Sequence, residues 1–344
     1  MIEDNFSFKQ VVDFGNLYKA YKDSKKGKGF TKSRIKFEMS ALDGIYQIKR
    51  LLETKNFEIG KYNKFKVYEP KERIIEAGTF KDKIVQHSLC DNTLLPMLNK
   101  EFIQTNYAGQ IGKGTLYGLD CLKAQMYLAH QKYGYDCWLV KGDISKFFYS
   151  INHDVLKDVV EYFVADEDVY WLCEKFIDST EGFGLPLGNQ ISQVFALLYL
   201  SGFDHFITGE LGVKYYGRYM DDFYLIVESK EYAKFCLECI ESFIKTLGLK
   251  LNGKTQIIQF KNGIKFCGFH SYVTKDGKVI RKLTNEKKRA VKKKYRKMAK
   301  LVRENKMSKE KFIRSYESWK NHVLHGNCVK FTYKMEKMVS EIIT

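Results

Sequence analysis

Two adjacent acids, Asp221 and Asp222, are the residues of this sequence whose types and spacing most suggest chemistry. They follow Tyr219–Met220 at a predicted strand turn, and the apolar run Phe223–Val227 comes directly after them. Carboxylates placed side by side repel one another unless a cation neutralises them. Asp143 stands 78 residues earlier, at the end of another predicted strand, and supplies a third carboxylate. An Asp pair alone is typical of a turn or a cap, so only the three acids together indicate chemistry.

Three carboxylates on two neighbouring strands are suited to bind two Mg2+ ions about 3.5–4 Å apart. In such a site one ion lowers the pKa of an attacking 3′-hydroxyl, and the other binds a triphosphate and stabilises the leaving group. Mg2+ fits this role because it takes oxygen ligands and keeps waters and substrate phosphates in its shell. We therefore expect Asp143, Asp221 and Asp222 to be catalytic and to hold two Mg2+ ions, for which Mn2+ is expected to substitute.

The elements that must position these acids are predicted from apolar periodicity. Trp138–Ile144 is a predicted strand, and Lys214–Gly217 and Phe223–Val227 form a hairpin around the paired acids. Phe65–Ile75 is a predicted strand pair with its turn at Glu69–Pro70. Helical spacing predicts helices over Ser40–Thr54, Phe80–Asn99, His153–Phe163 with Asn152 as its cap, Gln190–Leu211, Glu231–Leu247 and nearly everything after Asn285. Because helices separate the strands, the middle of the chain is α+β.

Composition supports a packed protein with sub-domains. The chain has 344 residues, of which 44% are hydrophobic, and only three prolines, with no Ser/Gly-rich linker. No run of about 18 apolar residues predicts a membrane span, and Met1–Gly15 lacks the pattern of a signal peptide. The eight cysteines are expected to be reduced thiols, and Cys236 and Cys239 to pack within a helix rather than bind zinc.

The positive charge is concentrated at one end of the sequence. Residues 281–344 contain 20 Lys and Arg against 6 Asp and Glu, a net charge of +14 out of +17 for the whole chain. A long polyanion such as nucleic acid is the natural partner for such a segment, whereas the alternative is a solvated helix face.

Several motifs occur in the order found in one known family. They are Lys141–Asp154, Gly184–Gln193, Tyr219–Asp222, Leu249–Thr255 and Phe266–Phe269. Together they resemble the reverse transcriptase family, in which a Y-x-D-D hairpin and an upstream Asp form the metal site. This resemblance implies an α+β right-hand polymerase with an antiparallel-sheet palm. The implied domains are fingers at residues 1–135, a palm at 136–280 with a helical insertion at about 153–182, and a basic helical thumb at 281–344.

The resemblance also implies roles for individual residues. Ile144, which follows Asp143, joins the expected metal site, and Lys254 would protonate the pyrophosphate leaving group unless it is a surface lysine. The expected contacts with the incoming nucleotide are Leu187, Gly188, Gln193, Tyr219 and Met220.

Further residues are expected to select and bind the nucleotide. Phe148 would exclude a 2′-hydroxyl, which predicts a DNA product, and Phe147 would be the core residue, because neighbours on a strand point to opposite faces. Arg73, and less securely Lys71, match the position of the family's triphosphate clamp.

Nucleic-acid contacts are predicted on both sides of the palm. Lys113 and Gly114 belong to a glycine-rich segment that resembles a template contact, because glycine lets the backbone approach a phosphate closely. Gly268 lies in the segment that resembles the primer grip. Lys288, Lys292 and Arg296 are expected to follow a duplex backbone rather than read bases, whereas Tyr316, Trp319, His322 and His325 are expected to pack the thumb.

The second motif departs from the common retroviral pattern. Leu187 stands where many members have Gln, and Ser192–Gln193 replaces Ser-Pro, which puts high fidelity in doubt. That form resembles bacterial defence-associated and diversity-generating-retroelement enzymes. It implies a cytoplasmic, bacterial or phage-encoded enzyme without a membrane partner or a visible RNase H domain. The expected partners are an RNA template, deoxynucleoside triphosphates, an RNA–DNA or DNA duplex product and a dedicated noncoding RNA. The alternatives are a retroelement enzyme, a catalytically idle RNA-binding protein and an RNA-templated RNA polymerase.

Overall fold

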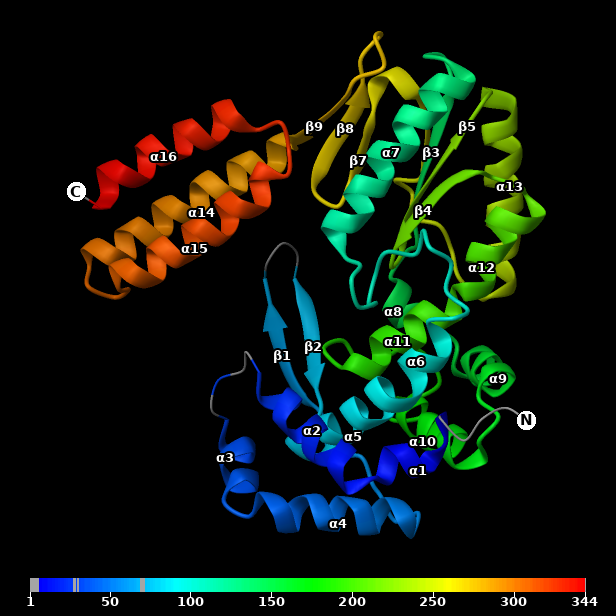
Figure 1. Ribbon diagram of the computed structural model, residues 1–344, viewed down its shortest axis with the longest axis vertical. Coiled ribbons are helices and arrows are strands. Elements are labelled where there is room, and N and C mark those ends of the chain that lie inside the picture. The colour runs from blue at the N-terminus through cyan, green and yellow to red at the C-terminus, as the bar shows by residue number, and fades with distance from the viewer. Residues whose placement is uncertain (1–5, 27–28, 30, 69–71, 344) are drawn as a thin grey trace. The chain divides into compact units, whose positions relative to one another are not determined.

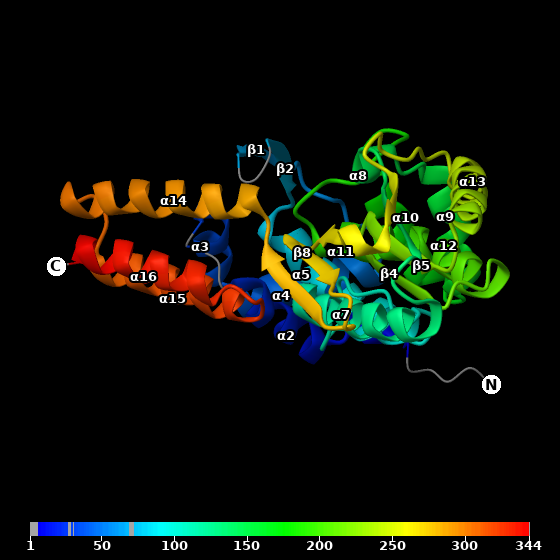
Figure 2. The same cartoon turned by 90° about the horizontal axis from the view of Figure 1, so that it is seen from above.

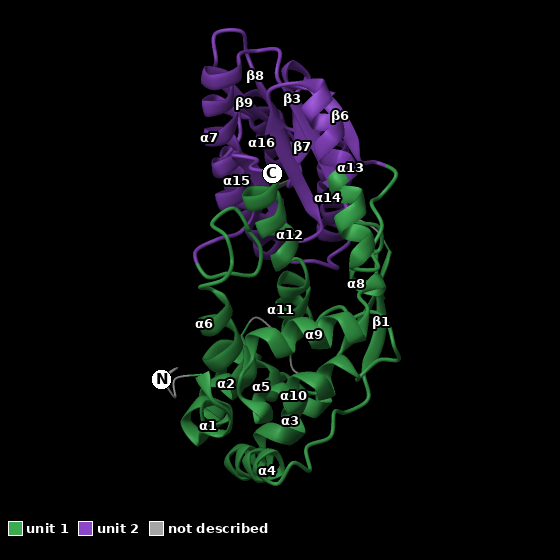
Figure 3. Cartoon of the chain, turned by 90° about the vertical axis from the view of Figure 1, so that its right-hand side faces the viewer, with its two compact units in different colours: residues 1–111, 144–211, 239–253 green, residues 112–143, 212–238, 254–344 purple. Residues whose placement is uncertain are grey.

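The computed structural model of the chain describes residues 6–26, 29, 31–68 and 72–343 (Figure 1). The chain divides into two compact units, and each unit is assembled from three separate stretches of sequence (Figure 3). Unit 1 consists of residues 1–111, 144–211 and 239–253, and unit 2 of residues 112–143, 212–238 and 254–344.

Unit 1 is mostly helical. Its elements are α1 (Phe8–Val12), α2 (Phe14–Lys25), α3 (Lys32–Glu38), α4 (Ala41–Glu53), α5 (Phe80–Leu89), the π-helical turn η2 (Cys90–Leu94), α6 (Leu95–Leu98), α8 (Phe147–Ser150), α9 (His153–Phe163), α10 (Glu167–Ile177), α11 (Gln190–Tyr199), α12 (Ser201–His205) and the π-helical turn η3 (Phe206–Glu210). α11 lies at the centre of this unit because nearly all its side chains are apolar and buried. It packs against α5 and α9.

One antiparallel hairpin, β1 (Asn63–Val67) and β2 (Arg73–Ala77), belongs to unit 1. β1 is exposed along its whole length. β2 is exposed at Arg73 and becomes half-buried toward Ala77. The predicted turn of this hairpin lies outside the described residues.

Unit 2 contains a four-stranded antiparallel sheet with the order β4-β5-β3-β6. The strands are β3 (Trp138–Asp143), β4 (Tyr215–Tyr219), β5 (Asp222–Val227) and β6 (Gln256–Gln259). β5 is a continuous apolar run and is buried from Phe223 to Val227, as expected for an inner strand covered on both faces. The helix α7 (Thr115–Tyr133) packs against β4 and β5, and α13 (Lys230–Thr246) begins in this unit.

The rest of unit 2 is a second sheet followed by three helices. The sheet has the order β7-β8-β9, with β7 (Ile264–Phe266), β8 (Phe269–Val273) and β9 (Val279–Leu283), and the 3-10 turn η4 (Phe260–Asn262) precedes it. The helices are α14 (Asn285–Arg303), α15 (Lys309–Leu324) and α16 (Val329–Ile343), drawn in orange and red in Figure 2. Tyr295, Phe312 and Met335, one from each helix, meet in a core of their own.

Most predicted elements are confirmed, with some differences at their ends and interiors. The helix expected over Phe80–Asn99 is interrupted by η2, and the one expected over Gln190–Leu211 is three consecutive pieces, α11, α12 and η3. Thr79 and Asp82 form a capping box that begins α5. The prediction that Phe147 and Phe148 lie on a strand is wrong, because both belong to the short helix α8.

The helix predicted to contain Cys236 and Cys239 is confirmed as α13. All eight cysteines are free thiols, and Cys236 is buried within α13 as expected. Among the residues that the structure describes, no helix is long and apolar enough to cross a membrane.

Candidate active site

The turn between β4 and β5 carries the paired acids. Tyr219 and Asp222 are the last paired residues of the hairpin, so Met220 and Asp221 form a two-residue turn. Met220 has φ +56°, a conformation that glycine usually takes in hairpin turns and that costs other residues about 1–2 kcal/mol. The strand residues below the turn are buried, whereas the four residues from Tyr219 to Asp222 are half-buried. The turn therefore holds its two acids in a strained but accessible position.

Asp143 lies directly opposite Asp222. The two are register partners on the antiparallel strands β3 and β5, so their side chains leave the same face of the sheet. On the other side of β3 the register pairs Lys141 with Gln256 of β6. The pairing of β3 with β6 does not continue past this point, because Ile144 bridges to Leu251. Lys254 is exposed in the turn that leads into β6.

A glycine next to Asp143 allows these two strands to pair. Gly142 is the register partner of Phe223, and a Cβ on Gly142 would lie 2.0 Å from the Cζ atom of the Phe223 ring. Real Cβ atoms do not approach other atoms so closely, so a side chain here would force the buried Phe223 ring or its strand to shift. Gly142 thus sets the spacing on which the Asp143–Asp222 pair depends.

Lys141 is a cation that already lies among the acids. Its ammonium contacts the carboxylate of Asp222 and donates a hydrogen bond of 3.2 Å to the carbonyl oxygen of Gly142. Burial lowers the pKa of Lys141 to about 8, and Asp143, Cys267 and Asp221 oppose that shift. Burial raises the pKa of the Cys267 thiol to about 12. Lys141 is therefore positioned as the internal counter-ion of the carboxylates.

The residues present fit an oxygen-ligated cation. Asp143 and Asp222 are cross-strand partners. The positively charged ammonium of Lys141 contacts Asp222 and is stabilised electrostatically by Asp143 and Asp221, so the acids already attract a cation. In the described part of the chain, no three acidic, His or Cys side chains are close enough to form a metal-binding group by themselves. Mg2+ is commonly bound by one or two carboxylates together with substrate phosphates, so the Asp143–Asp222 pair suffices as its protein part.

A buried arginine supports the turn from below. Arg218 is fully buried, and its Nη1 donates a hydrogen bond of 3.0 Å to the carbonyl oxygen of Met220. A planar guanidinium fixes direction as well as distance. Arg218 therefore anchors the backbone of the strained residue that precedes Asp221.

A loop in unit 1 carries the second predicted motif and is tied to α8. The backbone N–H of Gly184 donates to the carbonyl oxygen of Ile151 at 2.8 Å, and that of Leu185 donates to Phe148 at 2.7 Å. Gly184 has φ +83°, and a Cβ on it would lie 3.2 Å from the backbone of Tyr149. Only glycine fits both conditions without strain. Phe147 is buried and Phe148 is half-buried, so of the two rings Phe148 is the one that a ligand can reach.

The other end of the same loop is tied to β2. The N–H of Glu76 donates to the carbonyl oxygen of Leu187 at 2.8 Å, and a Cβ on Gly188 would lie 2.6 Å from Cγ2 of Ile75. Leu187 is half-buried and Gly188 is exposed. Arg73 begins β2 and is exposed, whereas Lys71 lies outside the described residues.

α11 presents one polar exception on a buried helix. Gln193 is exposed, while its neighbours Ser192 and Val194 are buried. Gln193, Gly188 and the half-buried Leu187 therefore form an accessible surface over the loop and the start of α11. The structure thus brings Phe148, Leu187 and Gly188 onto one loop framework.

The remaining predicted residues lie in separate places. Lys113 is half-buried and Gly114 caps the start of α7 with φ +144°. Gly268 has φ +85° in the turn between β7 and β8. Lys288 and Lys292 of α14 lie over the ring of Phe331 of α16, at 5.9 and 5.8 Å from its centre, and Arg296 is exposed. Ile144 is buried and forms a bridge with Leu251.

Three of the four C-terminal rings that were expected to pack do so. Tyr316 and Trp319 belong to the core of the three C-terminal helices, and the ring of His322 packs against Phe269. Burial lowers the pKa of His322.

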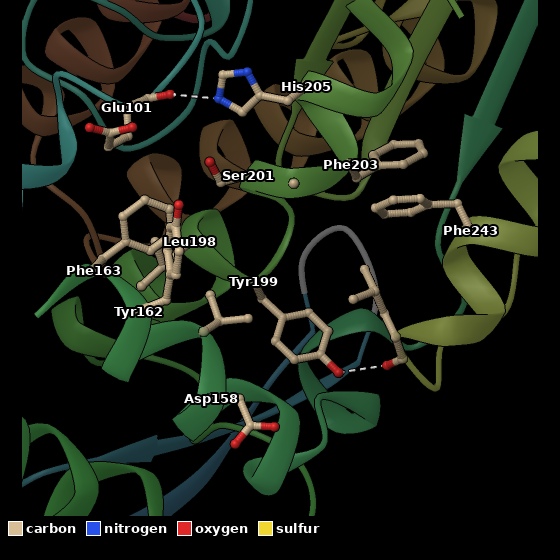
Figure 4. A pocket seen from close by; sticks show the side chains of 13 residues that line it. Glu101, Asp158, Tyr162, Phe163, Leu198, Tyr199, Ser201, Phe203, His205 and Phe243 are labelled. Carbon is tan, nitrogen blue, oxygen red and sulfur yellow. Dashed lines mark hydrogen bonds between the residues drawn. The ribbon is translucent and has the colours of Figure 1, made fainter. Parts of the chain in front are cut away.

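A pocket in unit 1 lies outside the predicted motifs (Figure 4). Two of the polar groups that line it bond to backbone carbonyl oxygens of the same lining. The hydroxyl of Tyr199 donates to Leu247 at 2.6 Å, and Nε2 of His205 lies 3.0 Å from the carbonyl oxygen of Glu101. These hydrogen bonds join helices of unit 1 to one another, so the polar groups of the pocket serve the packing of the unit.

Sequence reasoning missed three residues that organise these sites, namely Lys141, Arg218 and Asn189. Lys141 and Arg218 were each visible as a lone cation within an apolar strand, which is a signal for a buried and paired charge. Asn189 gave no such signal, because Asn after Gly is common in turns.

Comparison with a family model covers the segment that carries most of these residues. The model of the family described as "Reverse transcriptase (RNA-dependent DNA polymerase)" matches residues 64–271. A search of curated proteins gives no match. Among solved structures, telomerase from Candida albicans, in complex with a fragment of telomeric RNA, is similar at 11% sequence identity and a TM-score of 0.49, over 70% of this chain and 51% of that chain. This chain therefore spans about half the length of that telomerase chain.

Proposed function

This chain belongs to the reverse transcriptase family and has its right-hand polymerase fold of helices and antiparallel sheet, and we propose that it makes DNA on an RNA template. The observation that carries this proposal is the pairing of Asp143 with Asp222 beside the Met220–Asp221 turn. Pairing across neighbouring strands gives a nucleotidyl-transfer site its fixed negative charge.

The protein's own residues would prepare the reacting groups. When bound, two Mg2+ ions supply the Lewis acidity that activates the primer's 3′-hydroxyl and neutralises the triphosphate. Asp143, Asp221 and Asp222 hold the charge that such ions require, and Ile144 fixes the end of β3. Lys254, exposed in the turn before β6, would protonate the pyrophosphate.

The loop framework of unit 1 would bind the deoxynucleotide. Arg73 offers a guanidinium to phosphate oxygens, and Phe148 offers a ring that collides with a 2′-hydroxyl. Leu187, Gly188 and Gln193 supply an accessible surface beside them. Tyr219 and Met220 contribute from the turn that carries the acids.

Nucleic-acid binding follows from the charge distribution. Lys113 and Gly114 would contact the template backbone, and Gly268 would contact the primer. Lys288, Lys292 and Arg296 of α14 would bind phosphates of the duplex, since residues 281–344 carry +14 of the net charge.

We assign the biological role to a bacterial antiphage defence system that copies a dedicated noncoding RNA. The support is the sequence form of the second motif, Leu187 with Ser192–Gln193. A diversity-generating retroelement is the second candidate, because the same form occurs in its enzymes. A template-repeat and variable-repeat pair beside the coding sequence would decide for the retroelement.

The test is extension of a DNA primer on an RNA template with Mg2+ and deoxynucleotides. Asp221→Asn removes a charge without changing size, and we expect at least about a 100-fold loss of synthesis with RNA binding intact. Asp158→Asn, a change to an exposed carboxylate on α9, is the matched control and should leave synthesis unchanged. Equal synthesis by Asp221→Asn and the unmodified protein would contradict the assignment and favour an idle RNA-binding protein. Incorporation of ribonucleotides would indicate an RNA polymerase.

A further inference from the structure

We propose that Asn189 is a positioning residue that locks the loop Gly184–Asn189 to β2, and thereby fixes the binding of the incoming nucleotide. This inference rests on the proposed function, because Leu187, Gly188 and Arg73 are the expected nucleotide contacts. Asn189 itself is 2% exposed, so it acts through the backbone segments that it joins rather than by touching a ligand.

The side-chain amide of Asn189 bonds to both segments. Its Nδ2 donates to the carbonyl oxygen of Glu76 at 2.8 Å and to that of Pro186 at 3.1 Å. Its Oδ1 accepts from the N–H of Gly78 at 3.1 Å. Two carbonyls require a donor and one N–H requires an acceptor, so this environment is complementary to a carboxamide and not to a carboxylate.

These bonds extend the backbone pairing of the loop with β2. The N–H of Glu76 already donates to the carbonyl oxygen of Leu187 at 2.8 Å. The amide of Asn189 then satisfies the carbonyl oxygen of Glu76 and the N–H of Gly78. Glu76 pairs with Lys64 within the β1–β2 ladder but bonds on its other side to the loop, and Gly78 lies one residue past the end of the ladder. The Asn189 side chain thus supplies the hydrogen bonds that a neighbouring strand would otherwise make, and the backbone groups of Glu76 and Gly78 gain partners.

The surroundings leave little room for this junction to shift. A Cβ on Gly78 would lie 3.2 Å from Oδ1 of Asn189 and 3.4 Å from Cβ of Asp82. Asp82 is fully buried and accepts from the N–H groups of Gly60 at 3.2 Å and Thr79 at 2.8 Å. A packed, hydrogen-bonded interior transmits a displacement instead of absorbing it.

The loop is therefore fixed at both ends. Its first residues bond to α8 beside Phe148, and its last residue bonds to β2, the strand that begins with Arg73. Loss of the Asn189 bonds leaves the β2 end held by the backbone bond between Glu76 and Leu187, while the α8 end stays attached as before. Leu187 and Gly188 are then held less firmly relative to Arg73, which weakens nucleotide binding more than it slows the chemical step.

The decisive variant is Asn189→Asp, which keeps shape and the acceptor for Gly78 but sets a carboxylate oxygen against two carbonyls. We expect the KM for deoxynucleotide to rise about tenfold or more, with kcat reduced less than about threefold and the Kd for primer–template unchanged. Asn92→Asp is the matched control, since the Asn92 amide donates to the carbonyl oxygen of Ser88 at 2.9 Å within the same unit. Asn92→Asp should leave the KM unchanged even where it lowers Tm. Asn189→Ala, which adds no charge, should show the same KM-against-kcat split with a smaller rise.

Hydrogen exchange measured on the same variants separates this inference from the proposed function. Faster exchange in peptides covering residues 73–78 of Asn189→Asp and Asn189→Ala, but not of Asn92→Asp, supports the lock whether or not the protein makes DNA. Unchanged exchange in those peptides overturns it. An active enzyme whose Asn189 variants keep the KM of the unmodified protein also overturns it, whereas inactivity of the unmodified protein contradicts only the proposed function.

Discussion

At the scale of single residues, the proposed catalytic centre must balance the charge of its carboxylates. Asp143 and Asp222 leave the same face of the sheet, and an unbalanced pair of this kind would be unfavourable in a half-buried position. Lys141 resolves this, because its ammonium contacts Asp222 and is acted on by Asp143 and Asp221. The same contact makes Lys141 a competitor for any cation that enters the site.

We therefore predict that Lys141→Met tightens divalent-cation binding in the absence of substrate. Methionine keeps the length of the stem but removes the charge, so the carboxylates lose their internal counter-ion. Mn2+ titrated into the protein alone and followed by calorimetry should bind about tenfold tighter or more. Lys275→Met, at an exposed lysine in the turn before β9, is the control and should bind Mn2+ as the unmodified protein does. Weaker Mn2+ binding by Lys141→Met would show that Lys141 does not oppose the cation.

At the scale of elements, apolar pattern predicted the strands but not the details that align them. The hairpin around Asp221 and the strand before Asp143 follow from continuous apolar runs, and the structure confirms both. Their mutual register depends on one missing side chain, that of Gly142, and on one ring, that of Phe223. Periodicity reports which residues are apolar, whereas such a pairwise fit appears only when two distant strands meet.

Gly142→Ala should therefore disrupt the pairing of β3 with β5. The added Cβ would lie 2.0 Å from the Phe223 ring, so the buried ring or its strand must shift, and overpacking of this kind costs about 1–3 kcal/mol of the free energy of unfolding. We expect a lower Tm and a loss of primer extension greater than the loss of stability explains, because Asp143 and Asp222 move apart. The double variant with Phe223→Leu removes the clashing ring atom and should recover part of both losses. Additive losses in the double variant would contradict this coupling.

The local sequence also predicted helices better than their interruptions. The Asn152 cap and the span of α4 agree with the structure to within a residue. The π-helical turns η2 and η3 were not predicted, because a single turn of five residues is too short for apolar periodicity to distinguish it from an α-helical turn. Phe147–Phe148 was predicted as strand for a similar reason, since Lys146 with φ +48° begins a helical turn that no propensity signals.

At the scale of the whole molecule, the positive charge lies almost entirely in the C-terminal segment, residues 281–344. The first 280 residues, which include the paired acids and the loop Gly184–Asn189, carry a net charge of only +3. The C-terminal helices hold the excess charge, yet they have an independent apolar core around Tyr295, Phe312 and Met335. The basic character of this segment could be predicted from the sequence alone, because net charge is a count of residues and requires no knowledge of tertiary contacts.

The last prediction concerns the side of α14 on which we propose that a duplex binds. Lys288 and Lys292 lie over the ring of Phe331, which ties their stems to α16 and limits their freedom. Lys292, Lys293 and Lys297 are all exposed. Replacing Lys288, Lys292 and Arg296 by Ala should reduce the slope of log K against log salt, for an RNA–DNA duplex, by about 3, one for each phosphate that is no longer neutralised. The matched triple at Lys293, Lys294 and Lys297 removes the same charge from the same helix and should change the slope by less than about 1. Equal changes in both triples, measured by fluorescence anisotropy, would mean that α14 attracts the duplex only through its net charge.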